Sequence, residues 1–185
     1  MKKTLKYIVL IAGLLLCGGA AMAQEAETAT LDSGNTAWIL AATMLVMLMT
    51  IPGLAFFYGG LVRRKNVLSV MMQCVVLTAV ITIEWIVYGY SAVFGESFAD
   101  RGILGEFIGG FDKIFLYGIS KDALTSGNIP EVLFALFQCK FAVITPALIV
   151  GAFAERIKFS GFLLFSLLWS IFVYNPMAHW VWGGF

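Results

Sequence analysis

The sequence predicts an all-α polytopic membrane protein with four transmembrane helices. Of its 185 residues, 61% are hydrophobic and only 12% are charged, whereas soluble domains carry about 25% charged residues. The apolar residues gather in four long runs, and two of the turns that join them are short and basic. Runs of about 20 apolar residues, at about 1.5 Å per helical residue, match a hydrocarbon core of about 30 Å. The net charge of +1 gives no indication of a nucleic-acid partner.

The N-terminal residues 1–23 have the features of a secretory signal peptide. Three lysines among the first six residues precede an apolar stretch over 7–17, which at 11 residues is too short to span a bilayer. Ala21–Ala23 supplies the small residues of an A-x-A cleavage site. Cys17 raises the alternative of a lipoprotein, although Leu16 before it is bulky for such a site. Cleavage would leave the mature N-terminus outside the cytoplasm.

Four spans follow in order. The first contains Pro52 and Gly53, which predict a kink that membrane helices tolerate when neighbours satisfy the freed carbonyl. The third opens at Pro130 and Glu131, which suit the first turn of a helix. Between the second and third spans the chain turns polar and rich in glycine, which predicts a loop with short helical pieces. The expected spans cover residues 34–60, 67–95, 131–154 and 159–180, with the loop at 96–129.

The charges in the turns predict the orientation. Short cytoplasmic loops collect Lys and Arg. Arg63, Arg64 and Lys65 form one basic turn, and Arg156 with Lys158 forms the other. Two spans separate these turns, so both lie on the cytoplasmic side, while the 96–129 loop and the mature N-terminus lie outside. A bacterial inner membrane is the expected location.

Glu84 and Lys140 are the formal charges deep inside the spans. Each costs on the order of 3 kcal/mol on insertion scales, so each is expected to face protein or a partner. Counted from the outer ends of their helices at about 1.5 Å per residue, both lie roughly 15 Å deep. Equal depth and opposite sign favour a buried ion pair. The alternative is a protonated Glu84 with Lys140 extending toward the membrane surface.

Aromatic residues are the remaining candidates. Phe137 and Phe141 are four residues apart and therefore share a helix face. Trp180 and Trp182 lie at the outer boundary of the last span, and the single His179 precedes them. Taken one at a time, these residues are typical of packing, of a membrane-interface belt and of a capping histidine.

Taken together, the motifs resemble those of the ammonium transporter (Amt/Rh) family. The segments that carry this resemblance are GLAFFYGGLVRRKNVLSVMMQ (53–73), VYGYSAVFGE (87–96), ALFQCKFAVITPALIVGAFAERIKFSGFLLF (135–165) and YNPMAHWVWGG (174–184). The resemblance covers nearly all of residues 24–185. It implies that the chain is the first part of an eleven-helix, inverted-repeat fold that assembles as a homotrimer.

The resemblance also implies a site and partners. By motif position, Phe137, Phe141 and Trp182 correspond to the family's outer ammonium-recruitment site, with Phe141 as one gating ring. Ammonium is expected to bind there, lose a proton and cross an apolar pore as ammonia. Three further residues, Gln138, His179 and Glu96, are candidates for supporting this vestibule. The other implied partners are the lipid bilayer and a cytoplasmic nitrogen-regulatory protein, although the latter's usual docking region lies beyond residue 185.

Three alternatives stay open at this point. The first is an ammonium sensor built on the same fold, and the second is a non-conducting truncated membrane protein, because the family's acidic motif and pore histidines are expected after residue 185. A structural or assembly membrane protein would explain the spans but not the motifs. No enzyme, cofactor or metal site is expected, because the sequence shows no paired carboxylates, metal-ligand cluster or activated nucleophile.

Overall fold

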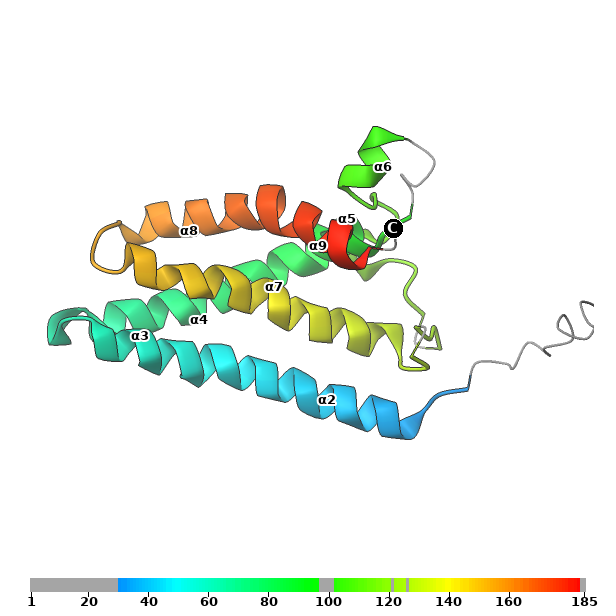
Figure 1. Ribbon diagram of the computed structural model, residues 1–185, viewed down its shortest axis with the longest axis horizontal. Coiled ribbons are helices and arrows are strands. Elements are labelled where there is room, and N and C mark those ends of the chain that lie inside the picture. The colour runs from blue at the N-terminus through cyan, green and yellow to red at the C-terminus, as the bar shows by residue number, and fades with distance from the viewer. Residues whose placement is uncertain (1–29, 97–101, 121, 126, 184–185) are drawn as a thin grey trace, which may run out of the picture. The chain divides into compact units, whose positions relative to one another are not determined.

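The four apolar runs form four long helical segments, which the computed structural model arranges side by side as a bundle (Figure 1). The structure describes residues 30–96, 102–120, 122–125 and 127–183, so the predicted signal peptide lies outside these ranges. Each segment has at least 23 residues and is therefore long enough to cross a hydrocarbon core of about 30 Å. The prediction of four transmembrane helices is confirmed.

The four spans have ends close to those expected from the sequence. They cover Ser33–Leu61, Arg64–Phe94, Glu131–Phe153 and Phe159–Trp182. The largest difference is at Arg64, because a tight helical turn over Arg64–Asn66 leads directly into the second span.

The first span is broken near its middle, as Pro52 predicted. It consists of α2 (Ser33–Leu48) and α3 (Ala55–Leu61), which are joined by a wide turn. Ile51 in this turn has a non-helical backbone with φ −129° and ψ 109°. At the start of α2, Asp32 caps the helix by accepting a hydrogen bond from the Asn35 amide at 2.8 Å.

The second and fourth spans each contain a wide, π-type turn. In the second span, α4 (Val67–Glu84) continues through the wide turn Trp85–Gly89 into α5 (Tyr90–Phe94). Such turns shift the register of a helix face and often occur at functional sites.

The fourth span repeats this construction. It begins with α8 (Phe159–Trp169), passes through the wide turn Ser170–Tyr174 and ends with α9 (Asn175–Trp182). The third span is a single helix, α7 (Glu131–Phe153), which starts after Pro130. Pro suits that position because the first turn of a helix has unpaired N–H groups in any case.

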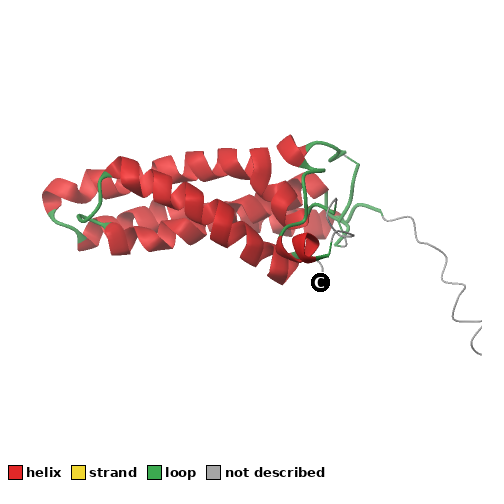
Figure 2. Ribbon diagram, turned by 90° about the horizontal axis from the view of Figure 1, so that it is seen from above, coloured by secondary structure: helices red, strands yellow, loops and turns green. Residues whose placement is uncertain are grey.

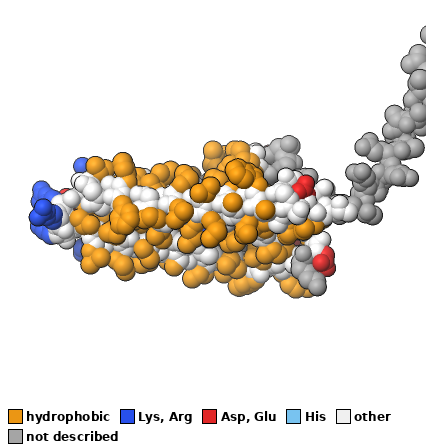
Figure 3. All heavy atoms as spheres, turned by 90° about the horizontal axis from the view of Figure 1, so that it is seen from below, with side chains coloured by type: hydrophobic (Ala, Val, Ile, Leu, Met, Phe, Trp, Pro, Cys, Tyr) orange, Lys and Arg blue, Asp and Glu red, His pale blue; other side chains and the backbone are white. Residues whose placement is uncertain are grey.

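Small buried side chains allow the helices to pack closely. The buried core contains the small residues Cys74 on α4 and Cys139, Ala142 and Ala147 on α7, and these two helices are in contact. Small residues at helix contacts are typical of membrane proteins, where close backbone approach replaces the hydrophobic driving force. The flanks of the bundle are covered by apolar side chains, while Lys and Arg gather at one tip (Figure 3).

The two basic turns lie together at that tip, which we call the basic end. Glu155, in the turn after α7, accepts hydrogen bonds from the Arg63 backbone N–H at 3.0 Å and from the Asn66 side-chain amide at 2.8 Å. These contacts confirm the prediction that the two basic turns lie at the same end of the bundle.

The opposite tip, which we call the loop end, is formed by the segment between α5 and α7. It contains the short helix α6 (Ile103–Phe107; Figure 1) and a tight turn over Ile114–Leu116. Figure 2 shows in green the loops that lie at the two ends of the helical bundle. An isolated bridge joins Leu124 to Pro130, and the described ranges contain no longer strand. The Gly109 amide donates to the Ala92 carbonyl at 2.7 Å, which fixes the loop on α5.

Candidate functional site

A cavity of about 590 Å³ lies at the loop end. Its wall combines residues from α2, α5, α7, α9 and the loop, so no single helix creates it. The lining residues that carry aromatic rings or charges are Tyr90, Phe94, Glu96, Lys113, Glu131, Phe134, Phe137 and Trp182. The cavity therefore offers aromatic faces together with two carboxylates and one amine.

The structure brings two of the three predicted aromatic residues to this cavity. Phe137 on α7 and Trp182 at the end of α9 both line it. Phe141 does not line it but packs its ring edge-to-face on Phe137, with centroids 5.0 Å apart and an interplanar angle of 83°. Phe141 thus lies one helical turn further along α7, beneath the cavity wall.

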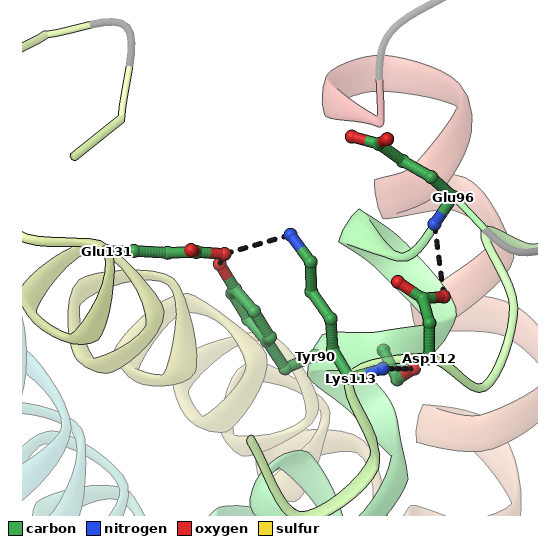
Figure 4. A network of polar contacts seen from close by, with 6 residues as sticks. Tyr90, Glu96, Asp112, Lys113 and Glu131 are labelled. Carbon is green, nitrogen blue, oxygen red and sulfur yellow. Dashed lines mark hydrogen bonds and ion pairs between the residues drawn. The ribbon is translucent and has the colours of Figure 1, made fainter. Parts of the chain in front are cut away.

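Two residues of the cavity wall, Lys113 and Glu131, form an ion pair (Figure 4). The Lys113 amine lies 2.9 Å from Glu131 Oε1, and the Tyr90 hydroxyl donates to the same oxygen at 2.9 Å. The amine also lies 5.9 Å from the centre of the Tyr90 ring, within the range of a cation–π contact. The side chains of Lys113 and Glu131 are 25% and 17% exposed, so the pair is only partly screened by solvent.

The loop that carries Lys113 is held by its backbone. The Lys113 N–H donates to Ser91 Oγ at 3.0 Å, and the Ser91 hydroxyl donates to the Gly110 carbonyl at 3.0 Å. The Glu96 N–H donates to Asp112 Oδ1 at 3.1 Å. Gly95 permits this approach, because a Cβ at that position would lie 2.6 Å from Asp112 Oδ1.

The prediction that Glu84 and Lys140 form an ion pair is wrong. Among the described residues, the ion pairs are Arg63–Glu155 and Lys113–Glu131. Glu84 is 7% exposed and accepts hydrogen bonds from Asn175 Nδ2 at 2.8 Å and Ser170 Oγ at 3.2 Å.

Glu84 and Lys140 do not pair because their side chains lie on helix faces that meet different neighbours. The wide turns in the second and fourth spans bring Glu84 against Ser170 and Asn175, so this face of α4 meets the fourth span rather than α7. Lys140 is half-buried on α7, four residues after the exposed Leu136. Lys140 does not line the cavity.

The three supporting candidates have different positions. Glu96 is exposed and lines the cavity, whereas Gln138 is half-buried on α7 and does not line it. His179 is buried with Nδ1 2.6 Å from the Val93 carbonyl and Nε2 2.9 Å from the Gly105 carbonyl. His179 thus joins α9 to α5 and α6 rather than facing the cavity.

Sequence reasoning missed Tyr90, Lys113, Ser170 and Asn175. Tyr90 lies within the VYGYS motif, and Asn175 is a polar residue directly before Pro176 in an apolar span, so both had a signal in the sequence. Lys113 had none, because its position depends on how the loop folds back on α5. Within the described ranges, no group of three or more His, Cys, Asp or Glu residues is arranged to hold a metal ion.

Residues 37–185 match the profile of the Ammonium Transporter Family. The chain belongs to this family. It is 50% identical over 154 residues to a putative ammonium transporter of Methanothermobacter thermautotrophicus, covering 83% of this chain and 37% of that protein. It is 47% identical over 173 residues to an ammonium transporter of Aquifex aeolicus, covering 93% of this chain and 39% of that protein.

Solved structures of the family have the same arrangement of helices. The structure of Mep2 from Candida albicans matches the present chain with a TM-score of 0.71 and 32% identity. The match covers 84% of this chain and 32% of Mep2. Mep2 of Saccharomyces cerevisiae matches with a TM-score of 0.71 and 33% identity, covering 83% of this chain and 33% of that protein. The chain therefore has part of the family fold and spans less than two-fifths of the length of these relatives.

Proposed function

We propose that this chain forms the entrance of an ammonium transport path through a membrane. The observation that carries the proposal is the cavity at the loop end, where Phe137 and Trp182 meet the carboxylates of Glu96 and Glu131. Aromatic faces attract a cation by about 0.5–2 kcal/mol, with more when it is desolvated. Carboxylates add attraction and accept hydrogen bonds, which favours ammonium over potassium because only ammonium has N–H donors.

The direction of transport follows from the charges at the two ends. Basic turns are typical of the cytoplasmic side. The loop end then faces outward, and the cavity receives ammonium from outside the cell, across a bacterial inner membrane. Beneath the cavity, Phe141 would act as a gate, and deprotonated ammonia would continue through an apolar path that the rest of a homotrimeric, eleven-helix protein completes. This part of the proposal rests on family resemblance.

Substitution of Trp182 tests the proposal in the full-length protein. Trp182→Leu should raise the half-saturation concentration for uptake of radiolabelled methylammonium into proteoliposomes by about 3- to 30-fold, the equivalent of about 0.7–2 kcal/mol of lost cation attraction. Inhibition of this uptake by potassium should become stronger, because ammonium can direct an N–H group at the indole face of Trp182 and potassium cannot.

Trp180→Leu is the matched control. Trp180 lies on the same helix and packs on Phe107 with centroids 5.5 Å apart, away from the cavity lining. Its substitution should leave the half-saturation concentration and the potassium inhibition near the wild-type values. Equal effects of the two substitutions, or none from Trp182→Leu, would contradict a recruitment site at this cavity.

A further inference from the structure

The cavity already holds a primary ammonium group, the side-chain amine of Lys113. Its contacts are those that a free ammonium ion would seek, namely a carboxylate oxygen of Glu131 at 2.9 Å and the face of the Tyr90 ring at 5.9 Å. The two charged side chains and the ring line the same cavity as Phe137 and Trp182. The Lys113 amine therefore occupies a position suited to a cation, in the same cavity as Phe137 and Trp182.

The backbone of Lys113 is held independently of its amine. Its N–H is bonded to Ser91 Oγ at 3.0 Å, whereas the amine is bonded to Glu131 alone. Four rotatable bonds separate the two groups, so the amine can leave Glu131 without a movement of the loop. Departure of the amine would leave the Tyr90 hydroxyl as the remaining donor to Glu131 Oε1.

The second carboxylate oxygen is an available acceptor. No described residue donates a hydrogen bond to Glu131 Oε2, and the Glu131 side chain is 17% exposed. With the amine in place, the charged side chains of the cavity wall are Glu96, Glu131 and Lys113. Without it, two carboxylates face the cavity with no counter-charge from the wall.

We propose that Lys113 is a tethered competitor that occupies a second cation site, formed by Glu131 and Tyr90, and thereby sets the concentration of ammonium that the cavity requires. This inference rests on the proposed function of the cavity. A group tethered by a short flexible chain has an effective concentration on the order of millimolar or more. Free ammonium or a primary alkylammonium ion, which makes the same contacts, must compete against that concentration.

The test removes the amine and measures uptake of radiolabelled methylammonium by the full-length protein in proteoliposomes. Lys113→Met should lower the half-saturation concentration at least about threefold, because the tethered competitor is gone. Lys113→Gln keeps a neutral N–H donor for Glu131 and should show the same direction of change. Lys65→Met, an exposed lysine at the basic end, is the matched control and should show no change.

Substitution of Glu131 separates competition from a general change of charge. In the double variant Lys113→Met with Glu131→Gln, the gain should disappear, because the site that the amine blocked is also removed. Calorimetric binding of methylammonium in detergent provides a second measurement that does not depend on transport. The two Lys113 variants should bind methylammonium more tightly than the wild type does. The double variant should bind it less tightly than the Lys113 variants do.

Each outcome decides the inference. An unchanged or raised half-saturation concentration in both Lys113→Met and Lys113→Gln, with folded protein by size-exclusion chromatography, would overturn the competitor role. A gain that persists in the double variant would overturn the Glu131 site. A wild-type protein that neither transports nor binds methylammonium would overturn the proposed function as well, whereas normal wild-type behaviour with unaffected Lys113 variants rejects only this inference.

Discussion

At the scale of single residues, Glu84 shows how a membrane helix accommodates a carboxyl group without an ionic partner. A buried polar group must be hydrogen-bonded, and losing a partner costs about 1–3 kcal/mol for each group left unsatisfied. Asn175 and Ser170 each donate to one oxygen of Glu84. The carboxyl group therefore joins the second span to the fourth at the level of their wide turns.

Substitution of Glu84 should separate hydrogen bonding from charge. Glu84→Leu should destabilise the protein by about 1–3 kcal/mol for each orphaned donor, while Glu84→Gln should cost much less because it keeps an acceptor for Asn175. Both free energies of unfolding can be measured in detergent by denaturant titration.

A double-mutant cycle then tests which residue is the partner of Glu84. Coupling between Glu84→Leu and Asn175→Ala should amount to about 0.5–3 kcal/mol, as expected for residues in contact. Coupling between Glu84→Leu and Lys140→Ala should stay within about 0.5 kcal/mol, as expected for independent sites. Strong coupling to Lys140 together with none to Asn175 would restore the ion pair in place of the hydrogen bonds.

The error about Glu84 and Lys140 has a physical cause. Counting residues along a helix gives the depth of a side chain, because the rise per residue is fixed at about 1.5 Å. It does not give the direction in which the side chain points once a π-type turn changes the helical register. The residue count therefore gave an expectation for the depth of Glu84 but no information on the neighbour that it faces. The prediction that Phe137 and Phe141 share one helix face is confirmed, because both lie in α7 and no irregular turn separates them.

At the scale of elements, Glu155 joins the two basic turns. Its backbone has φ 64°, a conformation that places its side chain beside the turn that follows α3. Hydrogen bonds from the Asn66 amide and from the Arg63 backbone N–H hold the pKa of the Glu155 carboxyl below its ordinary value. One carboxylate thus fixes the relative position of two segments that repel one another through their positive charges.

Loss of this carboxylate should loosen the basic end. Because the pKa of Glu155 is lowered in the folded protein, the stability that its carboxylate contributes is present above the ordinary pKa of a glutamate and is lost as the pH falls through the lowered pKa. Glu155→Ala should lower the hydrogen-exchange protection factor of the Asn66 backbone amide at neutral pH. Acidification of the wild type should lower the same protection factor, which corrects the observed exchange rate for the slower intrinsic exchange at low pH.

Glu106→Ala serves as the control for this experiment. Glu106 is an exposed carboxylate on α6 at the loop end, so its removal should leave exchange in the basic turns unchanged. Exchange at Asn66 that is equally fast in the wild type and in Glu155→Ala would show that Glu155 does not hold the turns together.

At the scale of the whole molecule, the sequence predicted the architecture better than the site. Four apolar runs predict four spans because the bilayer imposes one length on every crossing helix, and the basic turns identify one end because both carry the same sign. The cavity depends instead on the loop, which brings Lys113 to Glu131 across 18 positions of sequence. Hydrophobic patterning carries no information on such a contact.

The orientation of the bundle in the membrane is the last prediction. Basic residues from two separate turns gather at one end, and cytoplasmic loops collect such residues, so the basic end should lie inside and the loop end outside. Arg64→Cys and Ser120→Cys place an exposed thiol at each end, while the described native cysteines, Cys74 and Cys139, are buried. A membrane-impermeant thiol reagent added to intact cells should label Ser120→Cys at once and Arg64→Cys only after permeabilisation, with the unsubstituted protein as the blank. Labelling of Arg64→Cys in intact cells would invert the topology, and the cavity would then open to the cytoplasm and serve export or sensing rather than uptake.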